Sequence, residues 1–441
     1  MADTLESIFL NTSLGATQLD DGEHTLVTTD ANTSFVIKDM HVNGTSALTN
    51  THLELNGFNV SGITANATGS LIIPPSSTLK IKTTDYPFQF RKLTEWGMTS
   101  GALAYRESYQ DPNGNATGTP YEYYYSSSLS YYHDIIDFQK TRQTGTTNDY
   151  LHYATNDDNS VQRLHYINLG DNSTSVQVNQ NYDPIGLHDG KAYDFDGNAM
   201  AVIDLAANPT SGSSSYVNFG GLKSNSYNPA TQSSYPRGRA AHGFFFYVPN
   251  SGNYDLWAVN LSNGAWHKFE TGSSQQWYLA NNKGNFVVSI DSTVDKMYLY
   301  ANANNDTQLL QWVYDGWSSI EAIDSAALQT HNASSETITN NHTTAGGNHH
   351  MSSNMAKSNM GYDASGGFYY KNTSHERVHV DKNFNIVGTN VASITANGST
   401  LNNPNQAFVA KEDKLTQAQA SALSLTAPTF GIQLLGVKST V

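Results

Sequence analysis

The chain has 441 residues, long enough for two or more domains with sizeable cores. Only 14% of the residues are charged, the formal net charge is −15 and there is no cysteine. These values exclude disulfides and thiolate chemistry. They also argue against nucleic acid and anionic membranes as partners, because a negative chain repels phosphate groups.

The N-terminal sequence MADTLESIFLNTSLG has acidic residues but no basic segment ahead of its short apolar run, so it does not resemble a standard secretory signal. No apolar run approaches the roughly 20 residues that cross a bilayer. Abundant Asn, Thr, Ser and Tyr nevertheless predict an uncharged polar surface of the kind exposed outside cells. The competing explanation is a signal that was removed before this sequence begins.

Residues 1–88 are predicted to form a β-sandwich that serves as an attachment module. From Thr25 to Lys82, short apolar segments alternate with polar residues and are separated by Asn, Gly and Pro, which is the pattern of strands and turns. Pro74 and Pro75 cannot donate hydrogen bonds to a sheet, so we expect them at an edge or a bend.

Residues 89–410 repeat one pattern of strand, turn and strand. It is clearest in 241–272 and 285–321, recurs in 149–178 and 366–390, and is weaker in the segment that starts at Ala199. Repeats of roughly 40 to 50 residues, each a small antiparallel sheet, indicate the blades of a β-propeller. We therefore predict an all-β chain, a sandwich followed by a propeller-like body of antiparallel meanders. Stacked β-sandwiches are the alternative.

One segment carries a family resemblance. DLWAVNLSNGAWHKFETG, from Asp255 to Gly272, resembles a blade of the quinoprotein-like propellers, in which a strand and a Gly-containing turn lead to a Trp-containing strand. The resemblance implies a propeller body, although the six tryptophans are not evenly spaced.

Two segments depart from the repeat. Residues 322–360 are polar and low in complexity, which predicts an exposed excursion. Residues 411–441 are predicted to form a short helix and a C-terminal strand that docks on the first domain or on a neighbouring subunit.

The sequence HERVH, from His375 to His379, matches the zinc-protease pattern H-E-x-x-H. That chemistry needs a helix, which places two imidazoles one turn apart. Here the flanking residues favour a strand, in which the two histidines would lie about 13 Å apart. We interpret this segment as a solvated strand face.

Other histidines concentrate in the polar excursion, and they could bind a transition metal at an oligomer axis. The alternative, a hydrophilic loop without metal, is the one we adopt. These residues are His331, His342, His349 and His350.

Tyrosines crowd one predicted strand pair. An exposed patch of their rings would suit a glycan or a subunit interface, whereas alternation along a strand would bury about half of them. The residues are Tyr121, Tyr123, Tyr124, Tyr125, Tyr131 and Tyr132.

No catalytic, cofactor-binding or metal-binding residue is assigned. Asp194 and Asp196 lie two apart, but such a pair is a weak signal for a glycosidase. Arg237 and Arg239 fit a loop salt bridge better than a phosphate clamp. Nucleophile-elbow, phosphate-loop and dinucleotide motifs are absent from the sequence. We therefore predict that the chain is not an enzyme and needs no cofactor.

In composition, missing signal and repetitive β body, the chain resembles structural proteins of tailed-phage virions, such as tail, fibre and appendage proteins. The resemblance implies a homo-oligomer in the virion, in contact with other virion proteins and with a host-surface glycan. It would be assembled in the host cytoplasm, without membrane insertion. The alternatives are a polysaccharide-degrading propeller enzyme and a secreted bacterial adhesin.

Overall fold

The structure is a computed structural model, and its contacts divide the chain into two units. Unit 1 contains residues 1–93, 108–120 and 413–441, and unit 2 contains residues 94–107 and 121–412. The residues that the structure describes are 6–14, 23–43, 52–56, 58–60, 68–82, 90–111, 115–126, 135–156, 162–171, 176–178, 186–196, 199–218, 238–248, 255–272, 286–302, 309–325, 327–334, 361–371, 376–388, 391–402, 407–415, 417–425 and 430–440. In these segments, no helix has the length and apolar character needed to span a membrane.

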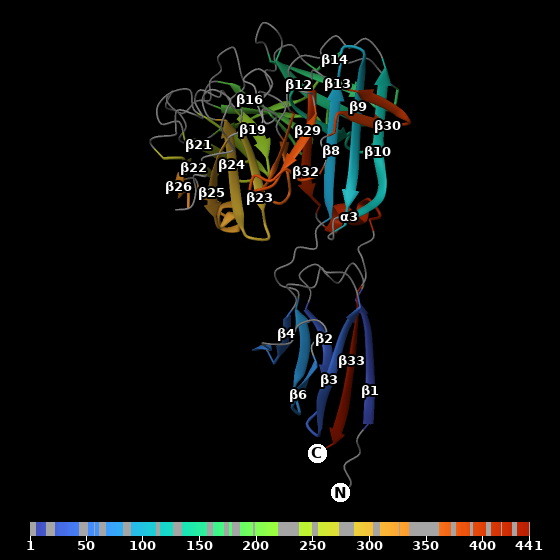
Figure 1. The fold of residues 1–441 in the computed structure, drawn as a ribbon. Coiled ribbons are helices and arrows are strands. Elements are labelled where there is room, and N and C mark those ends of the chain that lie inside the picture. Colours follow the sequence, from blue (N-terminus) through green and yellow to red (C-terminus); the bar gives the residue numbers. More distant parts are fainter. Residues whose placement is uncertain are drawn as a thin grey trace. The chain divides into compact units, whose positions relative to one another are not determined.

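Unit 1 contains two four-stranded sheets, with the orders β1-β33-β3-β6 and β2-β7-β4-β5 (Figure 1). The strands are β1 (Glu6–Leu14), β33 (Phe430–Thr440), β3 (Thr33–Asn43), β6 (Thr68–Ile73), β2 (Glu23–Thr28), β7 (Thr78–Lys82), β4 (His52–Leu55) and β5 (Phe58–Val60). With β33 as the eighth strand, this is the order of a jelly roll, a sandwich made of two Greek keys. The predicted β-sandwich is therefore present, and its last strand comes from the C-terminal end of the sequence.

The core of the jelly roll receives side chains from both sheets. Ile37 and Ile73 are buried from one sheet, and Val27 and Leu79 from the other. Pro74 follows β6 directly and its carbonyl accepts a hydrogen bond from Thr29 Oγ1 at 2.6 Å, so the prolines lie at a bend as expected.

β33 is paired on both sides. It forms antiparallel ladders with β1 and with β3. The C-terminal strand therefore docks on the first sandwich of the same chain, and residues 83–429 are an insertion between its seventh and eighth strands. The short helix α3 (Gln417–Ala422) precedes β33.

Unit 2 contains six consecutive sheets, which we call blades 1 to 6 (Figure 1), although the strand ends of blade 1 fall within the ranges of unit 1. In blade 1, which has the order β10-β9-β8-β32, a strand from late in the chain joins three early ones. The other blades are antiparallel meanders, to which blade 4 adds the parallel strand β26. The bounds of blades 1 to 3 are β8 (Arg91–Met98), β9 (Ala102–Gln110), β10 (Ala116–Ser126) and β32 (Ala407–Lys414); β11 (Ile135–Arg142), β12 (Asp149–Asn156), β13 (Gln162–Asn168) and β14 (Val176–Gln177); β15 (Gly186–His188), β16 (Lys191–Asp196), β17 (Ala199–Asp204) and β18 (Ser214–Asn218).

The remaining elements complete unit 2. They are β19 (Gly238–Ala241), β20 (Phe244–Tyr247), β21 (Leu256–Asn260), β22 (Trp266–Glu270) and β26 (Gln329–Asn332) in blade 4; β23 (Phe286–Asp291), β24 (Lys296–Asn302) and β25 (Leu309–Asp315) in blade 5; β27 (Gly361–Tyr362), β28 (Phe368–Lys371) and β29 (Arg377–Val380) in blade 6; the hairpin β30 (Ser393–Ala396) and β31 (Ser399–Asn402); and the helix α2 (Trp317–Glu321).

Each blade packs on the next through a buried apolar cluster. Every cluster contains residues of two successive blades. In order along the chain, representative members are Trp96 and Phe138, Leu164 and Leu187, Tyr193 and Phe245, Phe269 and Tyr314, and Tyr300 and Phe368. A single four-stranded sheet could not bury both of its faces, so this stacking supplies the core.

Blade 6 also contacts blade 1, which closes the ring. The amide of Ala364 donates to Glu412 Oε2 at 2.9 Å, and Arg377 forms an ion pair with Glu95. Unit 2 is thus a β-propeller, closed by the sheet that β32 shares with β8. The predicted all-β fold is confirmed, and the stacked-sandwich alternative is wrong for this part of the chain.

Two sequence predictions are refined by blade 4. The predicted excursion, residues 322–360, begins with ordered structure, because β26 pairs in parallel with β22. Residues 335–360, which include His342, His349 and His350, lie outside the described residues.

Candidate functional site

The predicted tyrosine patch lies on β10, at the junction of blades 1 and 2. Tyr123 is only 5% exposed and its ring stacks on that of Tyr125 at 6.5 Å. The ring of Tyr121 packs against Tyr105, and the ammonium of Lys140 lies 3.7 Å from its centroid. These tyrosines pack on the apolar cluster between the two blades.

Side chains alternate between the two faces of β10, so the ring of Tyr124 lies on the face opposite to Tyr123. Tyr124 packs with the cluster that includes Ile394 of β30 and Leu401 of β31. Burial raises the pKa of Tyr121 to about 12 and that of Tyr123 further, so both phenols remain protonated at neutral pH. Tyr131 and Tyr132 lie outside the described residues, and contact of the patch with a glycan or a second subunit stays a prediction.

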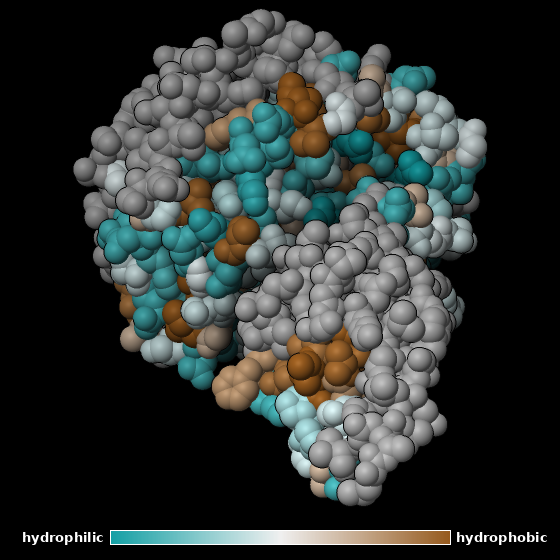
Figure 2. Space-filling view, turned by 60° about the horizontal axis from the view of Figure 1, so that its bottom comes forward, coloured by the Kyte–Doolittle hydropathy of each residue, from teal (hydrophilic) through white to brown (hydrophobic). Residues whose placement is uncertain are grey.

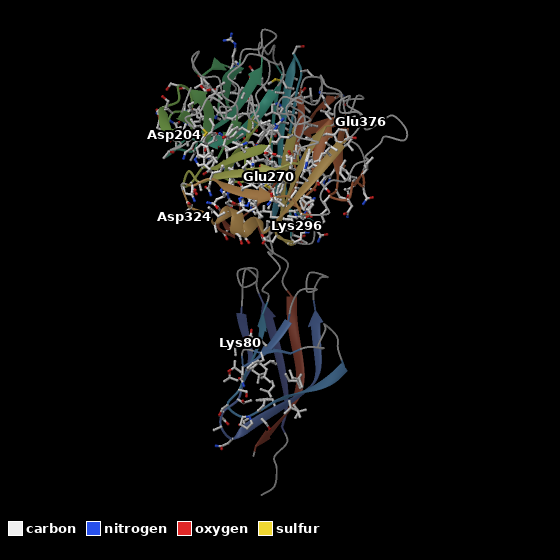
Figure 3. All side chains as sticks on the ribbon, turned by 90° about the vertical axis from the view of Figure 1, so that its left-hand side faces the viewer. Lys80, Asp204, Glu270, Lys296, Asp324 and Glu376 are labelled. Carbon is white, nitrogen blue, oxygen red and sulfur yellow. The ribbon has the colours of Figure 1, made fainter. Side chains whose placement is uncertain are left out.

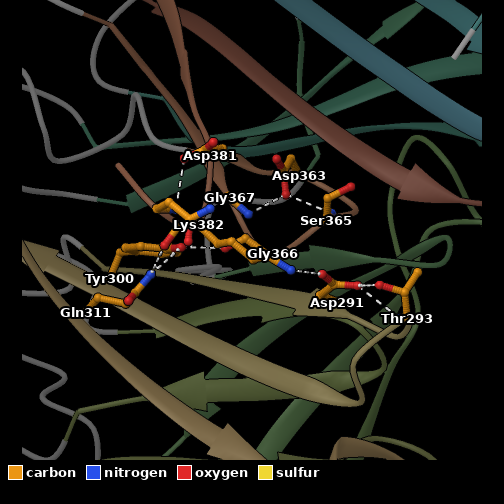
Figure 4. Close-up of polar contacts among 11 residues, drawn as sticks. Asp291, Thr293, Tyr300, Gln311, Asp363, Ser365, Gly366, Gly367, Asp381 and Lys382 are labelled. Carbon is orange, nitrogen blue, oxygen red and sulfur yellow. Dashed lines mark hydrogen bonds and ion pairs between the residues drawn. The ribbon is translucent and has the colours of Figure 1, made fainter. Parts of the chain in front are cut away.

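A polar cluster lies at the junction of blades 5 and 6 (Figure 4). Its centre is Asp363, only 3% exposed, in the turn between β27 and β28. Asp363 Oδ1 accepts hydrogen bonds from the amides of Ser365 at 2.8 Å and Gly367 at 2.5 Å, and Oδ2 contacts His379 Nε2 at 2.8 Å. The carboxylate therefore fixes the turn and connects it to β29.

A second carboxylate connects blade 5 to the turn after β29. Asp291 Oδ2 accepts from Lys382 Nζ at 2.8 Å, and Oδ1 accepts from the backbone of Thr293 at 2.9 Å. Burial raises the pKa of Asp291, but these hydrogen bonds outweigh burial and leave the pKa below its ordinary value. The charged form is the one that this geometry stabilises.

Hydrogen bonds to backbone carbonyls complete the cluster. Tyr300 Oη donates to the carbonyl of Gly366 at 2.5 Å, and Gln311 Nε2 donates to that of Lys382 at 2.7 Å. Ser289 Oγ donates to the carbonyl of Gly367 at 2.5 Å. Side chains of blade 5 therefore satisfy buried backbone groups of blade 6, and the arrangement acts as a clasp between the two blades.

We expect Asp363→Ala to weaken this clasp. It would leave buried amides without an acceptor, at about 1–3 kcal/mol for each unsatisfied donor. Urea unfolding measures the loss. The matched control is Asp381→Ala, because Asp381 Oδ1 accepts two amides at 2.8 Å in an exposed turn, where water can replace it. An equal loss in both variants would contradict the role given to buried Asp363.

The HERVH segment is a strand where the structure describes it. Glu376 precedes β29 and His379 lies in it, paired with Tyr369 across the sheet. His375 lies outside the described residues. Among the described residues, no group of three or more His, Asp or Glu side chains is arranged to hold a metal ion.

The other predicted residues do not form a common site. Asp194 and Asp196 lie two apart in β16. Arg239 lies in β19, where burial lowers its pKa and the charge of Asp137 opposes this change. Arg237 lies outside the described residues. Charged side chains from different parts of unit 2, such as Asp204, Glu270, Lys296, Asp324 and Glu376, are spread over it in Figure 3.

Buried histidines were not found by sequence reasoning. His152, His165 and His267 are fully buried. His152 Nε2 contacts the carbonyl of Pro209 at 2.8 Å, and His267 Nδ1 contacts His331 Nε2 at 2.9 Å. The available signal was their position within strand segments, where alternation places one residue in two inside.

Comparison with known proteins gives only the fold. No family model and no curated protein matches the chain. Similar solved structures include the β-propeller domain of Myceliophthora thermophila Cps50 (Swd1), at 8% identity over 68% of this chain and 86% of that one, with a TM-score of 0.33. The propeller domain of the Pyrococcus furiosus trilobed protease is similar at 8% identity, over 72% and 96% of the two chains, with a TM-score of 0.28.

A quinoprotein alcohol dehydrogenase-like protein of Bacteroides thetaiotaomicron is also similar, at 9% identity over 74% and 97% of the two chains, with a TM-score of 0.24. The chain has a β-propeller body. The ring of blades described above establishes it, and similarities this low carry no argument about function.

One sequence prediction is corrected by the comparison. We predicted that the chain is not an enzyme, but the similar structures include a Mycobacterium tuberculosis puromycin-hydrolysing peptidase, an ancestral GH74 enzyme and the NanB sialidase of Streptococcus pneumoniae. Propellers of this general shape include enzymes, so a propeller body and missing motifs do not exclude catalysis. The prediction is withdrawn.

Proposed function

We propose that the protein is a structural component of a tailed-phage particle. In this proposal the jelly roll assembles with other copies and with other virion proteins, and the propeller is displayed for contact with the host surface. One observation carries the proposal: the propeller is inserted between β7 and β33, so both ends of the insertion are anchored in one jelly roll. Jelly rolls are common in viral capsid proteins and lectins.

The surface of unit 1 supports an assembly role. Phe58 is 78% exposed and Ile72 is 63% exposed, each on a strand at the edge of its sheet. Figure 2 shows an apolar patch on this unit. Exposed edge strands with large apolar side chains favour association, because a neighbouring strand can pair with the edge and cover them. A second copy of the chain is the partner that we propose.

The composition supports an exterior location. Only 14% of the residues are charged and there is no cysteine, so no disulfide forms and most polar residues of the chain are uncharged. Multiple copies on one particle would combine weak glycan contacts into firm attachment.

Light scattering after size exclusion, together with antibody labelling of particles from the producing culture, tests the proposal. We expect a defined oligomer and labelled particles. A stable monomer that is absent from particles and cleaves polysaccharide would overturn the proposal in favour of the enzyme alternative.

We expect Phe58→Ser combined with Ile72→Thr to weaken the oligomer at least tenfold. Loss of two buried apolar side chains removes about 1.5–3 kcal/mol each when they are fully covered. The concentration dependence of the mass measures the change. Val294→Thr is the control, because Val294 is 43% exposed but lies in unit 2. An unchanged dissociation constant for the double variant would place the contact elsewhere.

A further inference from the structure

β26 is an added strand, and one side-chain hydrogen bond connects it to β22 among the residues that the structure describes. It pairs in parallel with β22 over four residues, from His267 opposite Gln329 to Glu270 opposite Asn332. Thr330 and Asn332 are exposed, so only Gln329 and His331 face inward. Gln329 Nε2 donates to the carbonyl of Ala327 in its own segment. His331 is therefore the side chain that connects β26 to β22.

The connection is a hydrogen bond between two imidazoles. His267 Nδ1 and His331 Nε2 are 2.9 Å apart, the ring centroids are 5.2 Å apart and the planes differ by 20°. These values bring the two nitrogens together edge to edge with the rings nearly in one plane. One ring must donate and the other must accept, so this bond needs at least one neutral imidazole.

The surroundings oppose positive charge on this pair. His267 is fully buried. Its ring centroid lies 5.4 Å from that of Phe244 and 6.2 Å from that of Phe269. Burial and the neighbouring His331 lower the pKa of His267 to about 4, and burial also lowers the pKa of His331. A proton on either ring is therefore bound less readily in this strand pair than in water.

Within the described residues, the carboxylates on the packed elements have other roles. β20, β21 and β26 carry no charged side chain apart from His331. On β22, Lys268 pairs with Glu270 at 2.8 Å and with Asp255 at 3.7 Å. Asp315 of β25 pairs with Lys296 at 3.2 Å, and Glu321 of α2 is exposed.

We propose that the His267–His331 bond is an acid-sensitive latch that holds β26 on blade 4. The imidazole of a released β26 binds a proton more readily than the closed pair does, so acid favours the form in which β26 has left the edge of β22. Protonation of both rings would also replace the bond with repulsion between two positive charges. The inference is independent of the function proposed above.

The part that opens is bounded on both sides. Before β26, Asn260 Nδ2 donates to the carbonyl of Glu321 and Asn263 Nδ2 donates to that of Ile323. After β26, the amide of Ser334 donates to the carbonyl of Val313 in blade 5. These contacts do not titrate near neutrality, so opening is limited to the residues between Ile323 and Ser334.

Amide hydrogen exchange of the full chain, corrected for intrinsic rates, tests the latch between pH 7 and pH 5. We expect protection of residues 329–332 to fall at least tenfold over this range and to stay below that of β21 of the same blade, whose amides exchange only when the whole protein unfolds. His331→Gln is the informative variant, because Gln can still hydrogen-bond and His331 is only partly buried. In this variant the protection of residues 329–332 should not change with pH.

Two results would overturn the proposal. One is equal protection of β26 and β21 at pH 5, which would mean that β26 opens only through general unfolding. The other is an unchanged pH dependence in His331→Gln. His331→Ala provides a further check, because it should lower the protection of β26 already at pH 7 by removing the bond.

Discussion

Gly361→Ala is expected to destabilise the protein by about 3 kcal/mol or more, because the site cannot accept a methyl group. A Cβ at Gly361 in β27 would lie 1.6 Å from the carbonyl oxygen of Ala410 in β32. These strands belong to blades 6 and 1, whose contact closes the ring. The clash is with backbone, so no side-chain rotation relieves it, and Ala410→Gly should not rescue the variant. Urea unfolding of both variants measures the effect.

Gly101→Ala is the matched control. A Cβ at Gly101 would have no heavy atom within 4 Å, so the change should stay within about 0.5 kcal/mol. Gly186→Ala provides a second test at another blade junction, since its Cβ would lie 2.7 Å from the amide nitrogen of Ala240. If Gly361→Ala unfolds at the same urea concentration as Gly101→Ala, β27 and β32 are not in close contact.

We expect the free energy of unfolding to fall steeply as the pH decreases from about 6.5 to about 4.5. Burial lowers the pKa of His152 to about 4, of His165 to about 3 and of His267 to about 4. An unfolded chain binds these protons as the pH falls through about 6.5, whereas the folded chain does not until about pH 4, so the free energy of unfolding decreases across this window. Each histidine contributes about 1.4 kcal/mol per pH unit, and three contribute about 4.

Urea unfolding at a series of pH values from 7 to 4.5 measures this slope. A total stability of about 5–15 kcal/mol would be largely lost within this range. His152→Gln is the control, because its amide can still donate to Pro209 and does not titrate, so the slope should decrease by about a third. A flat profile between pH 6.5 and pH 4.5 would contradict the neutral buried histidines.

The local sequence pattern was sufficient for much of the fold. The meanders at 241–272 and 285–321 correspond to blades 4 and 5, because alternating residues and turn signals act over a few neighbours. The same reasoning placed His379 in a strand despite its match to a zinc motif. These conclusions depend only on residues close together in the chain, whose pattern can be recognised in the sequence itself.

Contacts between residues that are far apart along the chain could not be predicted from the local sequence pattern. Nothing local to residues 430–440 specifies that β33 lies between β1 and β3, and nothing local to His331 specifies His267 as its partner. Asp363 resembles any turn aspartate in the sequence, and only its burial between two blades separates it from Asp381. Such residues are distinguished by packing partners that are distant along the chain.

The position of β33 has a consequence for synthesis on the ribosome. The first seven strands of the jelly roll leave the ribosome long before the eighth, and the place between β1 and β3 stays vacant until residues 430–440 are made. During that interval both strands have unpaired backbone groups, which favour pairing with other chains. A product that terminates before residue 430 therefore lacks the strand that completes the jelly roll.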